Sequence, residues 1–427
     1  MAHHTSVSAY QRLTERLNRF PQGAPPSELL YKILAMLFSE REAELVSMLP
    51  IKPFNAAKAA EVWKMPEDWA AGVLDELASR AMLLDYETPD GGRSYVLPPP
   101  MAGFFEFSMM RVREDLDQKA LAELYHEYVT EGPEFGPALF GQGETQMGRA
   151  FVQEAALPDD DSLVVLDYER ASEVIKTARH IGIAMCYCRH KAMHQGRNCD
   201  APMDICMAFN TAADSLIRHG HVRRVDSAEC MDLLDQAQGH NLVQFGENQQ
   251  RGVSFICNCC GCCCEAMLAA RRLSFMHPVH TTNFMPQVDR ETCSGCGKCV
   301  AVCPVEAMTL VSANDPHNGN RKVARVDESV CLGCGVCVRP CAKEAICLKP
   351  RAKRVLTPRN SVHRAVLMAI ERGKLQYLLF DNQASMTHQA MAAVLGVILG
   401  LPPVKRAVAA KMMNSRYLDA MMAKQLR

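Results

Sequence analysis

Apolar positions recur at helical spacing near the start of the chain. One series follows Pro25 and consists of Leu29, Leu30, Ile33, Leu34 and Leu37. This spacing predicts a helix. A second, shorter helix is predicted from Asn55 to Trp63. A third is predicted from Pro66 to about Ser79, because a proline followed by acidic residues favours the first turn of a helix.

A hairpin is predicted after these helices. The segments 82–86 and 93–97 flank a turn made of Thr88, Pro89, Asp90, Gly91 and Gly92. Such a cluster of turn residues between two short apolar runs is typical of paired strands. Three helices and a two-stranded wing resemble a winged helix, a fold that contacts either DNA or protein.

The charges on the third predicted helix bear on that choice. It carries one basic residue, Arg80, against four acids, which are Glu67, Asp68, Asp75 and Glu76. A recognition helix normally brings Lys or Arg to the phosphates of DNA. We therefore expect this segment to dock protein or to be structural, and we do not expect nucleic acid as a partner.

The segment from 101 to 161 is interpreted as helical, with Leu116, Leu121, Leu124 and Tyr125 in the core. Its glycines Gly141, Gly143 and Gly148 lack the spacing of a dinucleotide-binding loop, so we interpret them as a turn. A strand is predicted over 163–166, a helix over 171–180 and a second strand over 181–185.

The C-terminal region begins with a predicted helix over 361–372, closed by Gly373, and a predicted strand over 375–380. The apolar run 390–401 precedes Pro402, Pro403 and the basic pair Lys405 and Arg406. Twelve residues are too few to span a bilayer. The run could lie on an anionic membrane surface, but we favour a buried helix.

Composition narrows the class of protein. The chain has 427 residues, 48% of them hydrophobic, so it can build a substantial core in two to four domains. Its N-terminus is polar and lacks the apolar core of a secretory signal. The net charge of −1 argues against a general attraction to nucleic acid or anionic lipid.

Cysteine is the most informative residue. Eight of the 20 cysteines form two copies of one spacing, C-x-x-C-x-x-C-x-x-x-C. The first run is Cys293, Cys296, Cys299 and Cys303, and the second is Cys331, Cys334, Cys337 and Cys341. Three cysteines at this spacing hold a [4Fe-4S] cluster and the fourth crosses to a neighbouring cluster. Zinc pairs use fewer cysteines per run, so zinc is the weaker alternative.

The two runs lie within an internal repeat of 38 residues. Val288-Asp289 recurs as Val326-Asp327, and Glu306-Ala307 recurs as Glu344-Ala345. The stretch from 284 to 350 resembles the bacterial two-cluster [4Fe-4S] ferredoxin domain. The resemblance implies one cluster on Cys293, Cys296, Cys299 and Cys341, and a second on Cys331, Cys334, Cys337 and Cys303. Ala342 departs from the usual proline, and residues 312–321 lengthen the link between the repeats.

A second group of ten cysteines precedes this stretch. They are Cys186, Cys188, Cys199, Cys206, Cys257, Cys259, Cys260, Cys262, Cys263 and Cys264. Thiolates this close together repel one another, and a bound metal compensates them. We expect them to be ligands of one or two further clusters, with their pairing unknown. The simplest assignment pools the first four with part of the 257–264 run. Zinc, or a catalytic cluster with an unusual ligand set, is the alternative.

Basic residues lie beside the first of these cysteines. They either offset the charge of an anionic cluster or form a solvated loop. These residues are Arg189, His190, Lys191, His194 and Arg197. Cys259-Cys260-Gly261 is similar to the Cys-Cys-Gly signature of heterodisulfide-reductase catalytic domains, but its second copy is missing. Cys230 and Cys347 are expected in the core.

The fold class expected is α+β with several domains. These are a winged-helix-like domain (1–100), a helical linker with a central α/β cysteine-rich domain (101–283), a ferredoxin-like domain (284–350) and a helical extension (351–427). This arrangement resembles multi-domain iron–sulfur proteins of anaerobic bacteria. Cysteines at metal spacing also indicate a reducing cytoplasm.

The function expected is electron transfer through the two clusters, and through one or two further clusters, to a redox partner. That partner would be a flavoprotein, a ferredoxin or an oxidoreductase subunit. Two alternatives stay open. One is an oxidoreductase with a substrate-binding cluster in the cysteine-rich domain, and the other is a redox-responsive winged-helix transcription regulator. No general base, nucleophile or oxyanion site is evident, so no catalytic residue is assigned.

Overall fold

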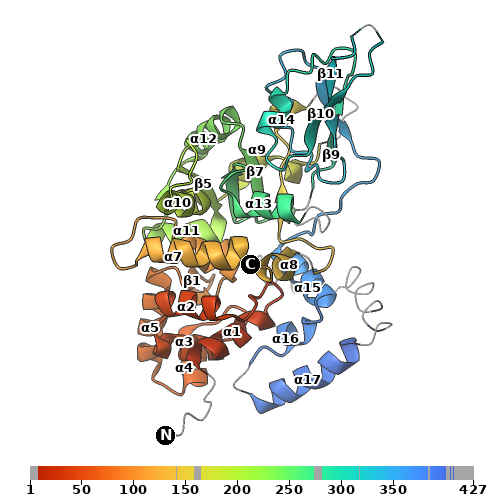
Figure 1. Ribbon diagram of the computed structural model, residues 1–427. Helices are drawn as coiled ribbons and strands as arrows, with labels where there is room; N and C mark the ends of the chain where they lie inside the picture. Colours follow the sequence, from red (N-terminus) through yellow and green to blue (C-terminus); the bar gives the residue numbers. More distant parts are fainter. Residues whose placement is uncertain are drawn as a thin grey trace. The chain divides into compact units, whose positions relative to one another are not determined.

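The computed structural model describes residues 8–140, 142–157, 165–273, 281–316, 318–382, 385–400, 404 and 407. The chain contains both helices and strands and divides into two compact units (Figure 1). The first unit comprises Met1–Thr145, Asp214–His221 and Ser361–Arg427, and the second comprises Gln146–Ala213 and Val222–Asn360. The mixed content agrees with the α+β class, while the four predicted domain boundaries stay a prediction.

The first unit is mostly helical. Its regular elements are α1 (Ala9–Arg19), α2 (Glu28–Leu37), α3 (Glu40–Met48), α4 (Ala56–Trp63), α5 (Glu67–Ser79), β1 (Leu84–Glu87), β2 (Arg93–Val96), η1 (Pro100–Phe104), α6 (Phe105–Phe107), α7 (Gln118–Tyr125), η2 (His126–Glu131), α8 (Phe135–Phe140), α15 (Ser361–Glu371), α16 (Leu375–Leu379) and α17 (Met386–Gly400). The predicted helices over 29–37, 55–63 and 66–79 are confirmed as α2, α4 and α5.

Two helices near the N-terminus were missed by the sequence analysis. Helices α1 and α3 each begin with a capping box, formed by Ser8 with Gln11 and by Ser39 with Glu42. In this motif the serine side chain accepts from the third helical amide, and the side chain at that third position accepts from the serine amide. The spacing S-x-x-E or S-x-x-Q was therefore the available signal. Four helices, rather than three, lie between Pro25 and the hairpin.

The hairpin β1–β2 is confirmed, with Leu84 opposite Val96 and Glu87 opposite Arg93. It is tied to α5 through Asp75, whose carboxylate accepts from Tyr95 Oη at 2.6 Å and pairs with Arg93 at 3.1 Å. Two of the four acids on α5 are thus paired within the unit, because Glu76 also forms an ion pair with Arg80 at 3.4 Å. The winged-helix assignment itself stays a prediction.

The C-terminal helices differ from two expectations. The helix over 361–372 is confirmed as α15, but the predicted strand over 375–380 is wrong, because these residues form α16. Leu375 packs there with Ile370 of α15 and Leu399 of α17. Tertiary contacts of this kind override the weak strand propensity of a short apolar run.

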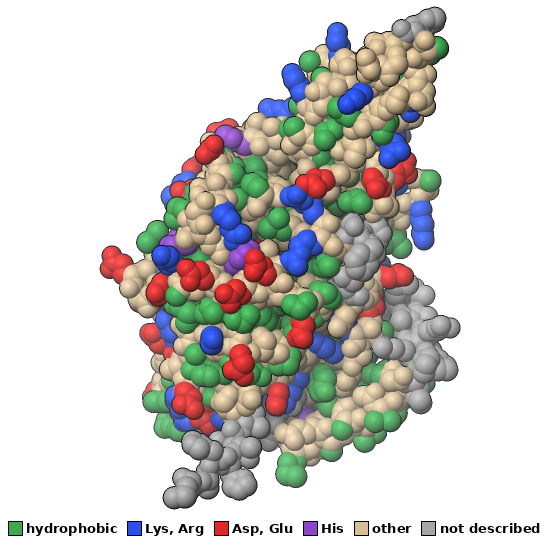
Figure 2. All heavy atoms as spheres, viewed as in Figure 1, with side chains coloured by type: hydrophobic (Ala, Val, Ile, Leu, Met, Phe, Trp, Pro, Cys, Tyr) green, Lys and Arg blue, Asp and Glu red, His purple; other side chains and the backbone are tan. Residues whose placement is uncertain are grey.

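Helix α17 was expected to be buried, yet it keeps much of its apolar surface exposed. Figure 2 shows hydrophobic side chains at the surface along this helix. The side chains of Val394 and Val397 are 63% and 74% exposed. It is apolar on all sides, so contact with α15 and α16 covers only one stripe, which includes Ala392 and Leu399. Among the described residues, no helix has the length and apolar character needed to cross a bilayer. Residues 401–403, 405 and 406 lie outside the described part.

His221 provides a test of packing in the first unit. It is buried, and its Nε2 lies 2.9 Å from the carbonyl oxygen of Ser79. Burial lowers the pKa of His221 from 6.5 to about 4, and the nearby charges of Arg111, Arg113 and His219 act in the same direction. The folded state therefore resists protonation. The contribution of His221 to stability is present above pH 6.5 and is lost as the pH falls towards 4.

Because of His221 alone, we expect the free energy of unfolding to fall by about 2 kcal/mol between pH 7 and pH 5. His221→Gln keeps a donor for the Ser79 carbonyl and cannot be protonated. Urea unfolding at the two pH values should show a smaller acid loss in this variant than in the parent protein. An equal loss in both would show that His221 does not carry the effect.

The second unit contains one six-stranded sheet and two smaller ones. Its regular elements are β3 (Gly148–Ala150), η3 (Glu154–Ala156), η4 (Asp167–Glu169), α9 (Ala171–Thr177), β4 (Ile181–Met185), α10 (Tyr187–His194), β5 (Asp204–Phe209), α11 (Asn210–Arg218, whose last residues belong to the first unit), β6 (Arg223–Arg224), α12 (Ser227–Gly239), β7 (Val243–Glu247), β8 (Phe255–Cys259), α13 (Glu265–Arg272), β9 (Phe284–Val288), α14 (Lys298–Val302), β10 (Met308–Ser312), β11 (Lys322–Val326) and β12 (Ile346–Pro350).

The six-stranded sheet has the order β3-β7-β8-β5-β4-β6, and its strand pairs are antiparallel. This corrects the expectation of an α/β cysteine-rich domain, since helices here do not connect parallel strands. The strand over 181–185 and a helix over 171–177 are confirmed. Gly148, expected in a turn within a helical region, instead pairs with Glu247 in β3 and β7. The predicted strand over 163–166 falls partly on residues outside the description, and Gly141 also lies outside it.

The two faces of this sheet bury different residues. On one face, Ile256 of β8 and Met207 of β5 pack with helices α9 and α12. Side chains alternate across a strand, so Cys257 and Cys259 of β8 project from the other face, where they join an apolar cluster with Met267 of α13. The register of β8 thus sets on which side of the sheet these cysteines lie.

The stretch 284–350 folds as two similar halves. Strand β9 pairs with β12 and β10 pairs with β11, both antiparallel. Equivalent backbone bonds close each half, from Asp289 N–H to the Ala345 carbonyl at 2.8 Å and from Asp327 N–H to the Ala307 carbonyl at 2.7 Å. Gly333 has a φ of +68°, and a β-carbon there would stand 2.0 Å from the Phe284 carbonyl oxygen. The 38-residue repeat is therefore a repeat of backbone geometry.

Candidate metal centres

The first set that the resemblance implied is Cys293, Cys296, Cys299 and Cys341, and it stays a prediction. Cys293 and Cys296 stand in the loop after β9, and Cys299 lies on α14. Cys293, Cys299 and Cys341 belong to one apolar cluster, and the amide of Ala324 donates to Cys293 Sγ at 3.4 Å. Cys296 is exposed, so this set reaches the surface.

The second set is enclosed. Cys303, Cys331, Cys334 and Cys337 line one cavity together with Pro286, Met308 and Val336. Amides of Ala307 and Gly333 donate to the sulfurs of Cys303 and Cys331 at 3.2 and 3.4 Å. Burial raises the pKa of Cys331 to about 11 and that of Cys334 to about 12. Four soft donors around a closed cavity suit a thiolate-ligated cluster, since a bound metal removes these protons.

Residues 292–345 match the 4Fe-4S dicluster domain family. This stretch is a 4Fe-4S dicluster domain. The chain as a whole gave no match to a curated protein, nor to a solved structure. The dicluster domain accounts for eight cysteines and supports iron–sulfur chemistry, while the ligand pairing within it stays a prediction.

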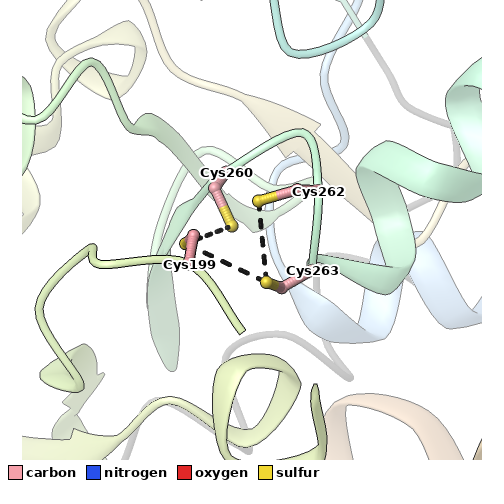
Figure 3. Close-up of side chains that lie close together, drawn as sticks. All are labelled: Cys199, Cys260, Cys262 and Cys263. Carbon is pink, nitrogen blue, oxygen red and sulfur yellow. Dashed lines mark hydrogen bonds between the residues drawn. The ribbon is translucent and has the colours of Figure 1, made fainter. Parts of the chain in front are cut away.

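Ten of the twelve cysteines outside the dicluster domain fall into two sets. The smaller set is Cys199, Cys260, Cys262 and Cys263, whose sulfurs all lie within 4.8 Å of one another (Figure 3). Three come from the loop between β8 and α13, and Cys199 comes from the segment before β5. The sulfur of Cys199 lies 3.7 Å from that of Cys260 and 3.9 Å from that of Cys263, and Cys262 lies 3.6 Å from Cys263. We call this set the four-thiol site.

The larger set forms a closed ring of thiols. Successive hydrogen bonds between sulfurs join Cys186, Cys188, Cys264, Cys259, Cys257 and Cys206, and the last returns to Cys186. The sulfurs of Cys259 and Cys264 are 3.1 Å apart. Cys186 and Cys188 come from the N-cap and first turn of α10, and Cys206 comes from β5. Cys257 and Cys259 come from β8, and Cys264 follows in the loop before α13. We call this set the six-thiol ring.

The thiol pKa values alternate around the ring. The pKa values of Cys186, Cys257 and Cys264 are lowered, chiefly by hydrogen bonding with their two neighbouring thiols. The pKa values of the three intervening cysteines are raised by the same hydrogen bonding and by burial; they are Cys188, Cys206 and Cys259.

Arg189 lies between the two sets. Its side chain is fully buried. The guanidinium donates to the Asn258 carbonyl at 3.2 Å and lies 3.8 Å from Cys260 Sγ. Attraction to the thiolates of Cys186 and Cys206, together with Cys260, outweighs burial and raises the pKa of Arg189. The described part of the chain contains no carboxylate paired with it. A buried cation needs a counter-charge, and the sulfurs provide it.

This corrects one expectation. The cations after Cys188 are not all part of a solvated loop, because Arg189, His190 and Lys191 are buried on α10, and Lys191 pairs with Glu265. The structure also places Cys199 with Cys260, Cys262 and Cys263, apart from Cys186, Cys188 and Cys206, while the ligand pairing itself stays a prediction. Glu265 was not singled out from the sequence, although its place directly after Cys264 was visible.

Thiols of both regions meet in a single apolar cluster. It contains Cys259 and Cys264 of the six-thiol ring together with Cys331 and Cys334 of the dicluster domain. The approach is close: a β-carbon at Gly261 would stand 2.7 Å from the carbonyl oxygen of Pro304, the residue after Cys303. Arg271 of α13 adds a bond to the Gly261 carbonyl at 3.0 Å and an ion pair with Glu306. The sequence carried no sign of this contact.

The remaining two cysteines lie outside both sets. Cys230 of α12 is fully buried, and burial raises its pKa to about 12. Cys347 lies on β12 and is partly buried. Both serve below as control positions.

Proposed function

We propose that this chain is an iron–sulfur electron-transfer protein that receives electrons at the dicluster domain and passes them to metal centres in the cysteine-rich region. The observation that supports this is the shared apolar cluster, in which sulfurs of the second dicluster set and of the six-thiol ring are buried together. Iron–sulfur clusters, when bound, supply one-electron carriers at potentials set by exposure and by hydrogen bonds to sulfur.

The protein differentiates the two dicluster sets by exposure. Cys296 of the first set is exposed, whereas Cys331, Cys334 and Cys337 of the second set are buried. Reduction adds negative charge, which water stabilises and an apolar surrounding does not. We therefore propose that the first set exchanges electrons with a soluble donor and that the second set relays them inwards.

The donor would meet the edge at Cys296. Lys298 lowers the pKa of that thiol, mainly through its backbone N–H and to a lesser degree through its charge. The exposed side chains of Lys298 and Lys322 favour an acidic redox protein. On α5, Glu67, Asp68 and Glu76 stay exposed, which supports a protein partner over DNA at that helix. A flavoprotein, a ferredoxin or an oxidoreductase subunit would suit either surface.

The contact at Gly261 allows a direct test of the proposed route. Gly261→Ala would bring a β-carbon against backbone atoms of Pro304, so the loop that follows β8 must move away from the dicluster domain. No ligand changes. We expect electron entry into the dicluster domain to keep its rate, and the later transfer into the cysteine-rich region to slow several-fold.

Anaerobic stopped-flow absorption with a reduced soluble ferredoxin would resolve the two phases. Gly319→Ala is the matched control, because no atom lies within 4 Å of the added β-carbon. A second phase that is identical in both variants, or absent from the parent protein, would rule out this route.

A further inference from the structure

The two sets of cysteines differ in geometry in a way that points to different metals. We propose that the four-thiol site binds one zinc ion, and that the six-thiol ring binds a separate polynuclear iron–sulfur cluster. The iron–sulfur part rests on the electron-transfer function proposed above, and the zinc part does not.

The spacing of the four-thiol site fits a single ion. A tetrahedral zinc with Zn–S bonds of about 2.3 Å places its sulfurs about 3.8 Å apart. Three of the six sulfur–sulfur distances are 3.6, 3.7 and 3.9 Å, and the others do not exceed 4.8 Å. A cubane cluster would hold its thiolates further apart, because four irons and four sulfides stand between them. Among the described residues, the dicluster cysteines form no group this compact.

The loop supports a structural role for that ion. Cys260, Cys262 and Cys263 follow β8 within four residues, and Cys199 joins them from the other side of β5 in sequence. A closed set of four thiolates is the usual ligand set of structural zinc, which fixes loops that otherwise lack a core. Cys262 is exposed, and the four cysteines are grouped apart from the dicluster sulfurs, with only Cys260 packing near the edge of a small separate cluster.

The six-thiol ring needs more than one metal ion. A tetrahedral ion takes four thiolates, and here six sulfurs each bond two neighbours without a break. At least two ions are required for all six to be ligands. Zinc has no redox chemistry, whereas Cys259 and Cys264 of the ring share an apolar cluster with Cys331 and Cys334. Iron with sulfide is the metal chemistry that suits both the number of thiolates and this neighbour.

The position of Arg189 fits this division. Its fully buried guanidinium lies 3.8 Å from Cys260 Sγ of the four-thiol site, and the residue directly follows Cys188 of the six-thiol ring. A buried cation needs an anionic neighbour, which metal-bound thiolates would provide.

The test is metal analysis of full-length protein purified without oxygen. Zinc, iron and acid-labile sulfide are measured per chain in Cys262→Ala, in Cys264→Ala and in the control Cys230→Ala. We expect Cys262→Ala to lose one zinc and keep its iron. Cys264→Ala should lose iron and sulfide and keep its zinc, and Cys230→Ala should lose neither.

Zinc-edge X-ray absorption of the parent protein covers the case in which a variant fails to fold. It should report four sulfur neighbours at about 2.3 Å. If Cys262→Ala and Cys264→Ala both fold and each loses zinc and iron together, the assignment of different metals to the two sets is overturned. A parent protein without zinc would overturn it as well. Iron limited to about eight per chain, the sum of two four-iron clusters, would overturn the iron–sulfur ring. That result would also leave the Gly261 experiment without an acceptor. Normal metal content with no second kinetic phase would instead refute only the proposed electron route.

Discussion

Cys334→Ala is expected to remove the second cluster of the dicluster domain and to stop electrons from entering the cysteine-rich region. Cys334 is buried, lines the cavity of the second set and belongs to the apolar cluster shared with the six-thiol ring. Iron should fall by about four per chain, the content of one cluster. Because metal binding contributes directly to folding, the urea midpoint of the second unit should also fall.

The first cluster of the dicluster domain is an internal control for this prediction. Cys293, Cys296 and Cys299 are unchanged, so a reduced ferredoxin should still reduce one cluster in the variant. Cys347→Ala is the control, since this partly buried thiol lies on β12 outside every ligand set. Full iron content in Cys334→Ala, or electron transfer that persists after the loss, would contradict the relay role of the second set.

Arg189→Met gives the second large effect, and its sign is diagnostic. If the surrounding sulfurs are metal-bound thiolates, removal of the guanidinium leaves buried anions uncompensated and should cost about 3–5 kcal/mol. If they are neutral thiols, the same change removes an unpaired buried cation and should be neutral or stabilising. The size of methionine is close enough to keep the packing.

Urea unfolding under anaerobic conditions would measure this change, with iron release followed in the same samples. Arg223→Met is a suitable control, because Arg223 is exposed and pairs with Glu229 at the surface. Such surface pairs contribute little. A variant at Arg189 that is as stable as the parent would show that the ten cysteines carry no net negative charge in the folded protein.

The dicluster domain was predictable because its ligand geometry is local. Three cysteines in each run lie within seven consecutive residues, and glycines such as Gly333 permit the turns between them. The repeat of Asp289 at Asp327 likewise reports a repeated backbone bond. In this domain the spacing of the cysteines in the sequence largely determines where they lie in space.

The division of the other ten cysteines was not predictable in that way. It depends on which face of β8 carries Cys257 and Cys259, and on how β5 pairs beside it. A shift of one residue in that register would exchange the two faces. The burial of Arg189 likewise arises from long-range packing, since on sequence alone a cluster of cations looks like a solvated surface.

The sequence pattern predicted some of the helices and missed others, and each miss has a physical reason. Capping boxes at Ser8 and Ser39 would have revealed α1 and α3, so those misses were avoidable. The helix α16 was not avoidable, because five residues carry too little periodicity to distinguish a buried helix from a strand. Its form is decided by contacts with α15 and α17.

The central claim is that electrons pass from the dicluster domain into a further redox centre. The most direct measurement is an anaerobic reductive titration of the full chain followed by electron paramagnetic resonance. We expect the signals of two reduced [4Fe-4S] clusters and, in addition, uptake of further electrons by a third centre that Cys264→Ala removes. Uptake that stops at two electrons per chain, one for each dicluster cluster, with spectra unchanged by Cys264→Ala, would contradict the account.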